Sequence, residues 1–165
     1  MVRDPTYLFL KISGESEHVI AVTRIFPYLA GTISHGIYFH KVEELALQCF
    51  SDADYAGDVQ TRLSTSGYVL KMCDGPLSWG SLRQRSVSLS TTESEYVATC
   101  EAVKELLWMK KFLEELIPNT IKKKPILLMD NQSAMKLVKN PQFHKRSKHI
   151  SEFDLEHVPT TEEFD

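Results

Sequence analysis

The order of patterns along the sequence predicts an α/β domain built on one mixed sheet. Three apolar, alternating segments separated by turn residues come first, at residues 45–52, 66–73 and 77–89, the last being one strand or a bent pair. A long stretch of helical periodicity follows, and after it a strand, a short helix and a final strand. Hairpin-linked strands pair antiparallel and a strand-helix-strand crossover joins parallel strands, so one sheet with both kinds of pairing is expected, flanked by helices.

The first 44 residues carry weaker patterns. Residues 19–30 are compatible with a short helix interrupted by Pro27, and residues 36–40 predict a strand that leads into a turn. We therefore expect a lead-in over residues 1–44 and one domain over residues 45–165, a length sufficient for a single core.

Two loops separate the first three strands. The first strand is expected to end at Asp52, because residues 53–65 are polar and contain a glycine. The sequence Asp74-Gly75-Pro76 predicts a turn between the second and third strands.

The periodicity then changes to that of a helix. Ser90-Thr91-Thr92-Glu93 has the serine-x-x-glutamate pattern of a capping box, which predicts a helix beginning here. Apolar residues recur at spacings of three and four until Pro118, where the helix must end.

The last third of the chain predicts a β-α-β unit. Residues 126–129 are wholly apolar, which suits a central parallel strand buried on both faces. Asn131 can cap a second helix over residues 132–139, and residues 153–158 alternate as the final strand.

Composition excludes several classes of protein. Hydrophobic residues make up 42% and charged residues 25% of the chain, which is ordinary for a globular protein. The formal net charge of −3 argues against a dedicated nucleic-acid binder, although an enzyme can grip nucleic acid through a local basic patch. The three cysteines are widely spaced, which argues against a disulfide framework or a zinc site and predicts buried free thiols.

Targeting signals are not visible in the sequence. The apolar run at residues 7–10 is too short for a signal-peptide core or a membrane span. An intracellular protein, cytoplasmic or nuclear, with no membrane partner is therefore expected.

Three acidic residues occupy positions at the ends of predicted elements. Asp52 and Asp130 each end an apolar strand, and Glu95 lies in the first turn of the long helix. If the strands are neighbours, the carboxylates can converge, and a divalent cation is then needed to offset their repulsion. Oxygen ligands favour magnesium or manganese over zinc. Local roles remain open alternatives, because Glu95 suits the helix dipole and both aspartates suit loops or turns.

A set of motifs resembles the ribonuclease H domain of copia-type retrotransposons. The resemblance covers roughly residues 20–165, and residues 24–32 look like the stretch that joins a reverse transcriptase to that domain. The motifs that carry it, in order, are Ser51-Asp52-Ala53-Asp54-Tyr55-Ala56-Gly57-Asp58, Arg62-Leu63-Ser64-Thr65-Ser66-Gly67-Tyr68, Ser78-Trp79, Arg83-Gln84, Leu89-Ser90-Thr91-Thr92-Glu93-Ser94-Glu95-Tyr96-Val97-Ala98, Asp130-Asn131-Gln132-Ser133-Ala134, and Asn140-Pro141 through Lys148-His149-Ile150.

The resemblance implies a fold and a reaction. It implies a ribonuclease H-like fold, a five-stranded mixed sheet flanked by helices, with two magnesium or manganese ions held by four acids. Matched by motif, the first three acids are Asp52, Glu95 and Asp130. The implied reaction is cleavage of the RNA strand of RNA–DNA hybrids during reverse transcription, with the reverse transcriptase of the same polyprotein as a partner.

Two departures from the family pattern leave catalysis open. The family has a helical segment of a dozen or more residues after Lys148-His149-Ile150, but here the final strand follows almost at once. The family's fourth acid would fall one position beyond Asp165, so the domain is expected to be incomplete at its C-terminus. The alternative function is a catalytically impaired relic, or a nucleic-acid-binding or interaction module of the same fold.

Basic residues are the candidates for contacts to the nucleic acid, because phosphates must be gripped. The first group is Lys145, Arg146, Lys148 and His149, together with His144, and the alternative for this group is a solvated basic loop. The second group is Arg83, Gln84 and Arg85. Trp79 and Trp108 interrupt apolar stretches and are expected in the core.

Overall fold

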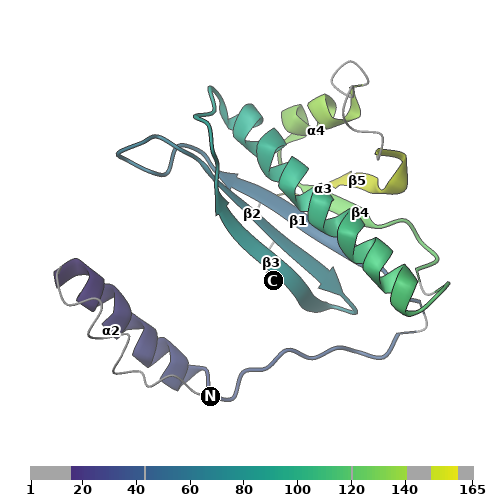
Figure 1. Cartoon of the computed structure of the whole chain (residues 1–165), viewed down its shortest axis with the longest axis horizontal. Coiled ribbons are helices and arrows are strands. Elements are labelled where there is room, and N and C mark those ends of the chain that lie inside the picture. Colours follow the sequence, from purple (N-terminus) through teal and green to yellow (C-terminus); the bar gives the residue numbers. More distant parts are fainter. Residues whose placement is uncertain (1–15, 43, 120, 141–149, 160–165) are drawn as a thin grey trace. The chain divides into compact units, whose positions relative to one another are not determined.

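The computed structural model describes residues 16–42, 44–119, 121–140 and 150–159, which fall into two units. One unit ends at Ile37 and contains helix α2 (Ser16–Gly31). The other begins at Tyr38 and contains the sheet and the remaining helices (Figure 1). The predicted helix at residues 19–30 is present, and it continues through Pro27.

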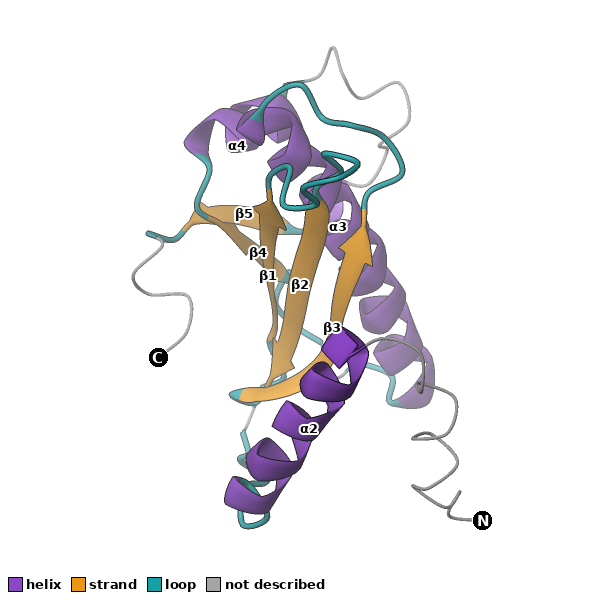
Figure 2. Ribbon diagram, turned by 90° about the vertical axis from the view of Figure 1, so that its left-hand side faces the viewer, coloured by secondary structure: helices purple, strands orange, loops and turns teal. Residues whose placement is uncertain are grey.

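The second unit is organised by a five-stranded mixed sheet, as predicted. Its strands are β1 (Leu47–Asp54), β2 (Thr65–Met72), β3 (Gly75–Arg83), β4 (Ile126–Met129) and β5 (Asp154–His157). Their order across the sheet is β3-β2-β1-β4-β5 (Figure 2). The hairpin-linked strands β1, β2 and β3 pair antiparallel, whereas β4 lies between β1 and β5 and is parallel to both. The apolar run at residues 126–129 is therefore an interior parallel strand.

The helices of this unit begin and end where their sequence signals predict. Helix α3 (Thr91–Leu116) is capped by Ser90, whose hydroxyl oxygen accepts from the Glu93 N–H at 3.2 Å. The Glu93 carboxylate accepts from the Leu89 N–H at 2.6 Å, which completes the capping box one residue further back than usual. Helix α4 (Gln132–Lys139) is capped by Asn131, and the 3₁₀ turn η2 (Ile150–Glu152) precedes β5.

Helix α3 packs on β1 and β2, and the core lies between them. Alternate residues of β1 point toward the helix, as strand geometry requires. The buried core cluster consists of Leu47, Cys49, Leu70, Ala102, Leu106, Met109, Leu127 and Phe153. Burial raises the pKa of the Cys49 thiol to about 12, so this cysteine behaves as a small apolar core residue.

The two tryptophans are exposed, and their prediction as core residues is wrong. Ser78 on β3 faces α3, where its hydroxyl donates to Glu105 at 2.8 Å, so its neighbour Trp79 points to the opposite face of the sheet and is 64% exposed. Trp108 lies on the outer side of α3, is 56% exposed and stacks on Phe112 with ring centroids 5.4 Å apart.

Three strand boundaries differ from the predictions. Residues 36–40 form no strand, although the His40 N–H donates to the Cys73 carbonyl at 3.4 Å. Strand β1 continues past Asp52 to Asp54, so Asp52 lies inside the strand. Strand β3 ends at Arg83 rather than near residue 89, and Arg83 pairs with Thr65, the first residue of the neighbouring strand β2.

Candidate metal centre

Asp52 lies on the exposed side of β1, opposite Gly67 of β2. Residues that face each other across an antiparallel pair project from the same side of the sheet. A side chain at position 67 would therefore stand beside the Asp52 carboxylate. Glycine leaves that space open, and a Cβ built there comes no closer than 3.8 Å to the Asp52 carbonyl oxygen. The backbone does not require glycine at this position, because no positive φ occurs there.

Asp130 directly follows β4, and along the strand direction it lies at the same register position as Asp52 of β1. In the parallel pairing of β1 and β4, Phe50 lies opposite Leu128, and each aspartate comes two residues later. The Asp130 carbonyl accepts a hydrogen bond from Nε2 of His157 on β5 at 2.9 Å. Since a carbonyl can only accept, Nε2 must carry the hydrogen. The backbone of Asp130 is thereby attached to the neighbouring strand.

Glu95 comes from the first turn of α3 and is only 7% exposed. Its position follows from the start of the helix, which the Ser90 cap determines. A carboxylate buried to this degree is costly unless charged or polar groups compensate it. Glu95 is therefore a buried acid directed at the same place as the more exposed Asp52 and Asp130.

The three carboxylates converge, as predicted. One oxygen from each of Asp52, Glu95 and Asp130 lies within 4.8 Å of the others. The donors are all carboxylate oxygens from three different elements, a set that suits magnesium or manganese and is unfavourable for zinc. Like charges this close repel, so a divalent cation would stabilise the arrangement. The residues present therefore fit a hard divalent metal ion.

A buried layer joins the three elements at residues close in sequence to the acids. Thr99 lies one helical turn after Glu95, and its hydroxyl contacts the sulfur of Met129 at 3.9 Å and the Ser51 hydroxyl at 3.4 Å. Ser51 precedes Asp52 and Met129 precedes Asp130 in the sequence. All three side chains are buried. The contacts fix the spacing of β1, α3 and β4 at the level from which the carboxylates project.

The second predicted group of phosphate contacts is partly wrong. Gln84 is buried, and its side-chain amide is engaged by protein groups, so it is not available to a phosphate. Arg83 forms an ion pair with Asp58 of the loop between β1 and β2, whereas Arg85 is exposed. The Thr61 backbone N–H, with smaller contributions from Gln60 and Arg83, holds the pKa of the Asp58 carboxyl below its ordinary value.

The first predicted group lies outside the described residues. It comprises His144, Lys145, Arg146, Lys148 and His149. The roles of these basic residues remain predictions from the sequence. Asp165, the residue before the position expected for the fourth acid, also lies outside the described residues.

Sequence reasoning missed four residues that support the acids. His157, Thr99 and Gly67 lie in segments that were correctly predicted as strands or helix, but no local pattern indicates what they contact, although Gly67 belongs to one of the motifs. Gln84 also belongs to a motif, and the phosphate contact predicted for it is wrong. Its flanking residues Arg83 and Arg85 suggested a basic surface, and only the structure shows that the side chain between them points inward.

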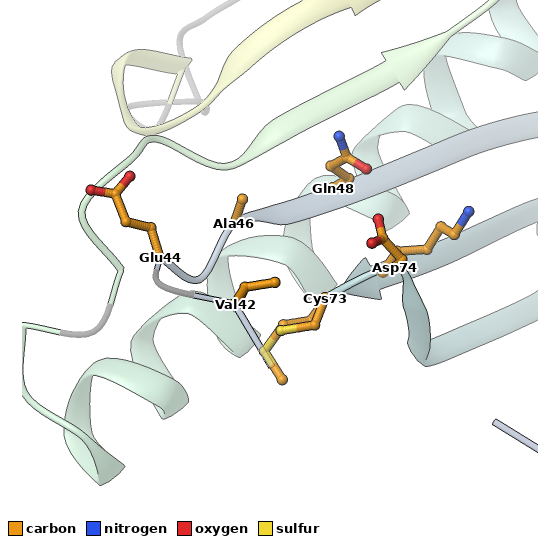
Figure 3. A pocket seen from close by; sticks show the side chains of 8 residues that line it. Val42, Glu44, Ala46, Gln48, Cys73 and Asp74 are labelled. Carbon is orange, nitrogen blue, oxygen red and sulfur yellow. The ribbon is translucent and has the colours of Figure 1, made fainter. Parts of the chain in front are cut away.

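A pocket of about 130 Å³ lies at the other end of β1 (Figure 3). It is lined by Val42, Glu44, Ala46, Gln48, Lys71, Met72, Cys73 and Asp74. These residues adjoin the first residues of β1 and the last of β2, whereas Asp52 is near the last residue of β1. The pocket is therefore separate from the acid cluster.

Comparison with known proteins relates most of the chain to transposon polyproteins. No family model matches. The chain is 42% identical over 135 residues to the retrovirus-related Pol polyprotein from transposon RE1 of Arabidopsis thaliana, covering 82% of this chain and 9% of the relative. It is also 42% identical over 142 residues to that from transposon TNT 1-94 of Nicotiana tabacum, covering 86% and 10%. The chain thus spans about a tenth of the length of these relatives.

A solved ribonuclease H1 isolated from compost aligns with 70% of this chain and 86% of its own, at 16% sequence identity and a TM-score of 0.48. None of the described helices combines the length and the apolar composition that crossing a bilayer requires.

Proposed function

We propose that this chain, which belongs with the retrovirus-related Pol polyproteins of transposons, carries a ribonuclease H-like domain that hydrolyses the RNA strand of RNA–DNA hybrids. The motifs quoted above support the assignment to this part of a polyprotein. The observation that carries the proposed chemistry is the approach of the Asp52, Glu95 and Asp130 carboxylates to within 4.8 Å of one another.

The roles of the acids follow from their positions. Asp52 and Asp130 are accessible enough to face a phosphodiester, whereas Glu95 is more buried and offers its oxygen from the first turn of α3. Two magnesium or manganese ions, when bound, would supply an activated water and stabilise the leaving oxygen. Asp52, Glu95 and Asp130 would hold these ions, and the open space above Gly67 would admit the substrate beside Asp52.

The substrate assignment rests on the chemistry that a hybrid presents. Recognising the RNA strand requires contacts to 2′-hydroxyls and to phosphates. We assign the phosphate contacts to Lys145, Arg146, Lys148 and His149. The proposed protein partner is the reverse transcriptase of the same polyprotein, and the proposed site of action is inside the cell. Replacing the Lys145, Arg146 and Lys148 side chains by alanine should weaken hybrid binding and reduce the slope of log affinity against log salt by about one unit per lost contact. An unchanged slope would show that this segment is only a solvated loop.

A second candidate function is a non-catalytic relic that binds hybrid without cutting it. It is favoured by η2, which provides only Ile150–Glu152 before β5 where the family resemblance implies a dozen or more helical residues. Loss of that segment would alter how a hybrid is held, and a small misplacement of substrate lowers rates severely.

Hybrid cleavage distinguishes the two candidates. The chain is incubated with an end-labelled RNA–DNA hybrid and Mg²⁺, and fragments of the RNA strand are measured. We expect Asp130→Asn to abolish cleavage and leave the circular-dichroism spectrum unchanged. The matched control is Asp74→Asn, because Asp74 is exposed at the other end of the sheet and has a φ of 64° that asparagine tolerates. Equal cleavage by Asp130→Asn would refute the proposed site, whereas binding without cleavage by the wild-type chain would favour the relic.

A further inference from the structure

The Gln84 side chain joins three parts of the fold through its amide group. It follows β3 directly and is only 5% exposed. Its Nε2 donates to the Ser66 hydroxyl at 3.0 Å and to the Ser94 carbonyl at 2.9 Å. Its Oε1 accepts from the Ser88 hydroxyl at 2.9 Å, and its backbone N–H donates to the Ser64 carbonyl at 2.8 Å. Both ends of the amide are therefore bonded inside the protein.

The chemistry of the partners determines the orientation of this amide. The Ser94 carbonyl can only accept a hydrogen bond, so the NH₂ end of Gln84 must face it. The Ser88 hydroxyl then donates to the oxygen at the other end. A flipped amide would place its oxygen against the Ser94 carbonyl oxygen, so Ser94 alone determines the orientation, because the Ser88 hydroxyl can either donate or accept.

The bond to Ser94 acts on the peptide group next to a metal-cluster acid. The Ser94 carbonyl belongs to the peptide bond that links Ser94 to Glu95, and Ser94 is fully buried. Gln84 also ties this peptide to Ser66 on β2, the strand paired with the one that carries Asp52. A movement of the first turn of α3 relative to β2 would break one of these bonds. The distance between Glu95 and Asp52 is thereby constrained.

We propose that Gln84 is a positioning residue for Glu95, and this inference rests on the proposed function of the acid cluster as a metal site. It does not touch the metal or the substrate. It holds the backbone from which the Glu95 carboxylate projects, in a site where ligands must keep their places to within about half an ångström. Residues that orient metal ligands typically change metal affinity or activity by roughly 10- to 100-fold when they are replaced.

The test replaces Gln84 by methionine, which keeps the length of the side chain and removes its hydrogen bonds. The matched control is Gln48→Met, since Gln48 is exposed near the first residue of β1, away from the acids. Mg²⁺ alone is titrated into each protein by calorimetry, and hybrid cleavage is measured against Mg²⁺ concentration. We expect Gln84→Met to weaken Mg²⁺ binding by roughly 10-fold or more and to leave the KM for the hybrid unchanged, whereas Gln48→Met matches the wild type.

A purely structural role predicts a different result. Gln84→Met would then lower the melting temperature while the folded protein kept the wild-type affinity for Mg²⁺, and that outcome overturns the inference. If Gln84→Met does not fold, Ser66→Ala decides, because it removes the bond that ties the Gln84 amide, and with it the Ser94 carbonyl, to β2; weaker Mg²⁺ binding supports the inference and wild-type affinity overturns it. Failure of the wild-type chain to bind Mg²⁺ would instead refute the proposed function, and the inference with it.

Discussion

The two ends of β1 place charged side chains in opposite ways. Near the last residues of the strand, Asp52, Glu95 and Asp130 are gathered within 4.8 Å although their charges repel. Near the first residues, charges lie at the surface in pairs of opposite sign, such as Lys123 with Glu44 at 3.1 Å. Exposed pairs of this kind contribute only about 0–1 kcal/mol and need no support from the interior.

The difference lies in what is beneath the charges. The acid end stands on a buried polar layer in which Thr99 contacts both Ser51 and Met129, and Gln84 secures the first turn of α3. Buried polar side chains need hydrogen-bond partners, and these groups have them inside the protein. The comparison indicates that buried polar contacts support the end of the sheet at which the three carboxylates gather, whereas surface ion pairs lie at the other end.

The largest effect on hybrid cleavage that tests this comparison between the two ends of β1 is expected from Gly67→Val. Valine at this position would stand beside Asp52 on the same face and obstruct the approach of a hybrid, while valine suits a strand and should not weaken the fold. We expect hybrid cleavage to fall on the order of 10-fold or more, with Gly67→Ala showing a smaller loss. Cleavage rates measure the obstruction of the hybrid, and denaturant midpoints measure the stability of the fold. Wild-type cleavage by Gly67→Val would show that this space is not the path of the substrate.

A smaller effect is expected from Thr99→Val, which keeps the shape of the side chain and removes the hydroxyl. The buried Ser51 hydroxyl loses a partner, and the free energy of unfolding should fall by about 1–3 kcal/mol. The control is Thr92→Val in the first turn of the same helix, where a half-buried threonine should tolerate the change within about 0.5 kcal/mol. Urea unfolding measures both. Equal free energies of unfolding for the two variants would show that the Thr99 hydroxyl does not stabilise the buried layer.

The smallest effect concerns the reactivity of Cys49, which lies in the core between the two ends. Burial raises its pKa to about 12, so the thiol stays protonated at neutral pH and the thiolate forms only as the pH approaches that value. Because the folded pKa is raised, this group's contribution to stability is complete at lower pH and is lost as the pH rises toward about 12. Iodoacetamide should label the half-buried Cys73 first at pH 8, as read by peptide mass spectrometry. Faster labelling of Cys49 would contradict its burial.

The sequence by itself determined the elements whose signals are local. Ser90 and Pro118 delimit α3, Asn131 starts α4, and the apolar run at residues 126–129 becomes an interior strand. These features depend on capping groups, backbone restrictions and periodicity, all of which act within a few residues. The convergence of the three acids was also predicted from the sequence, because Asp52 and Asp130 stand near the ends of strands, Glu95 stands in the first turn of a helix, and the motif resemblance implies that they act together.

Only the tertiary structure decided which faces and which polar groups are buried. Trp79 and Trp108 are large apolar residues that interrupt apolar stretches, which predicted a place in the core. Each nevertheless lies on the side of its element that faces away from the core. Gln84 lies between two arginines, which predicts a surface position. Its amide is nevertheless hydrogen-bonded inside the protein to Ser66, Ser88 and Ser94. Local patterns specify how a segment is shaped, whereas burial depends on which partner covers it, and that is decided by residues far away in the sequence.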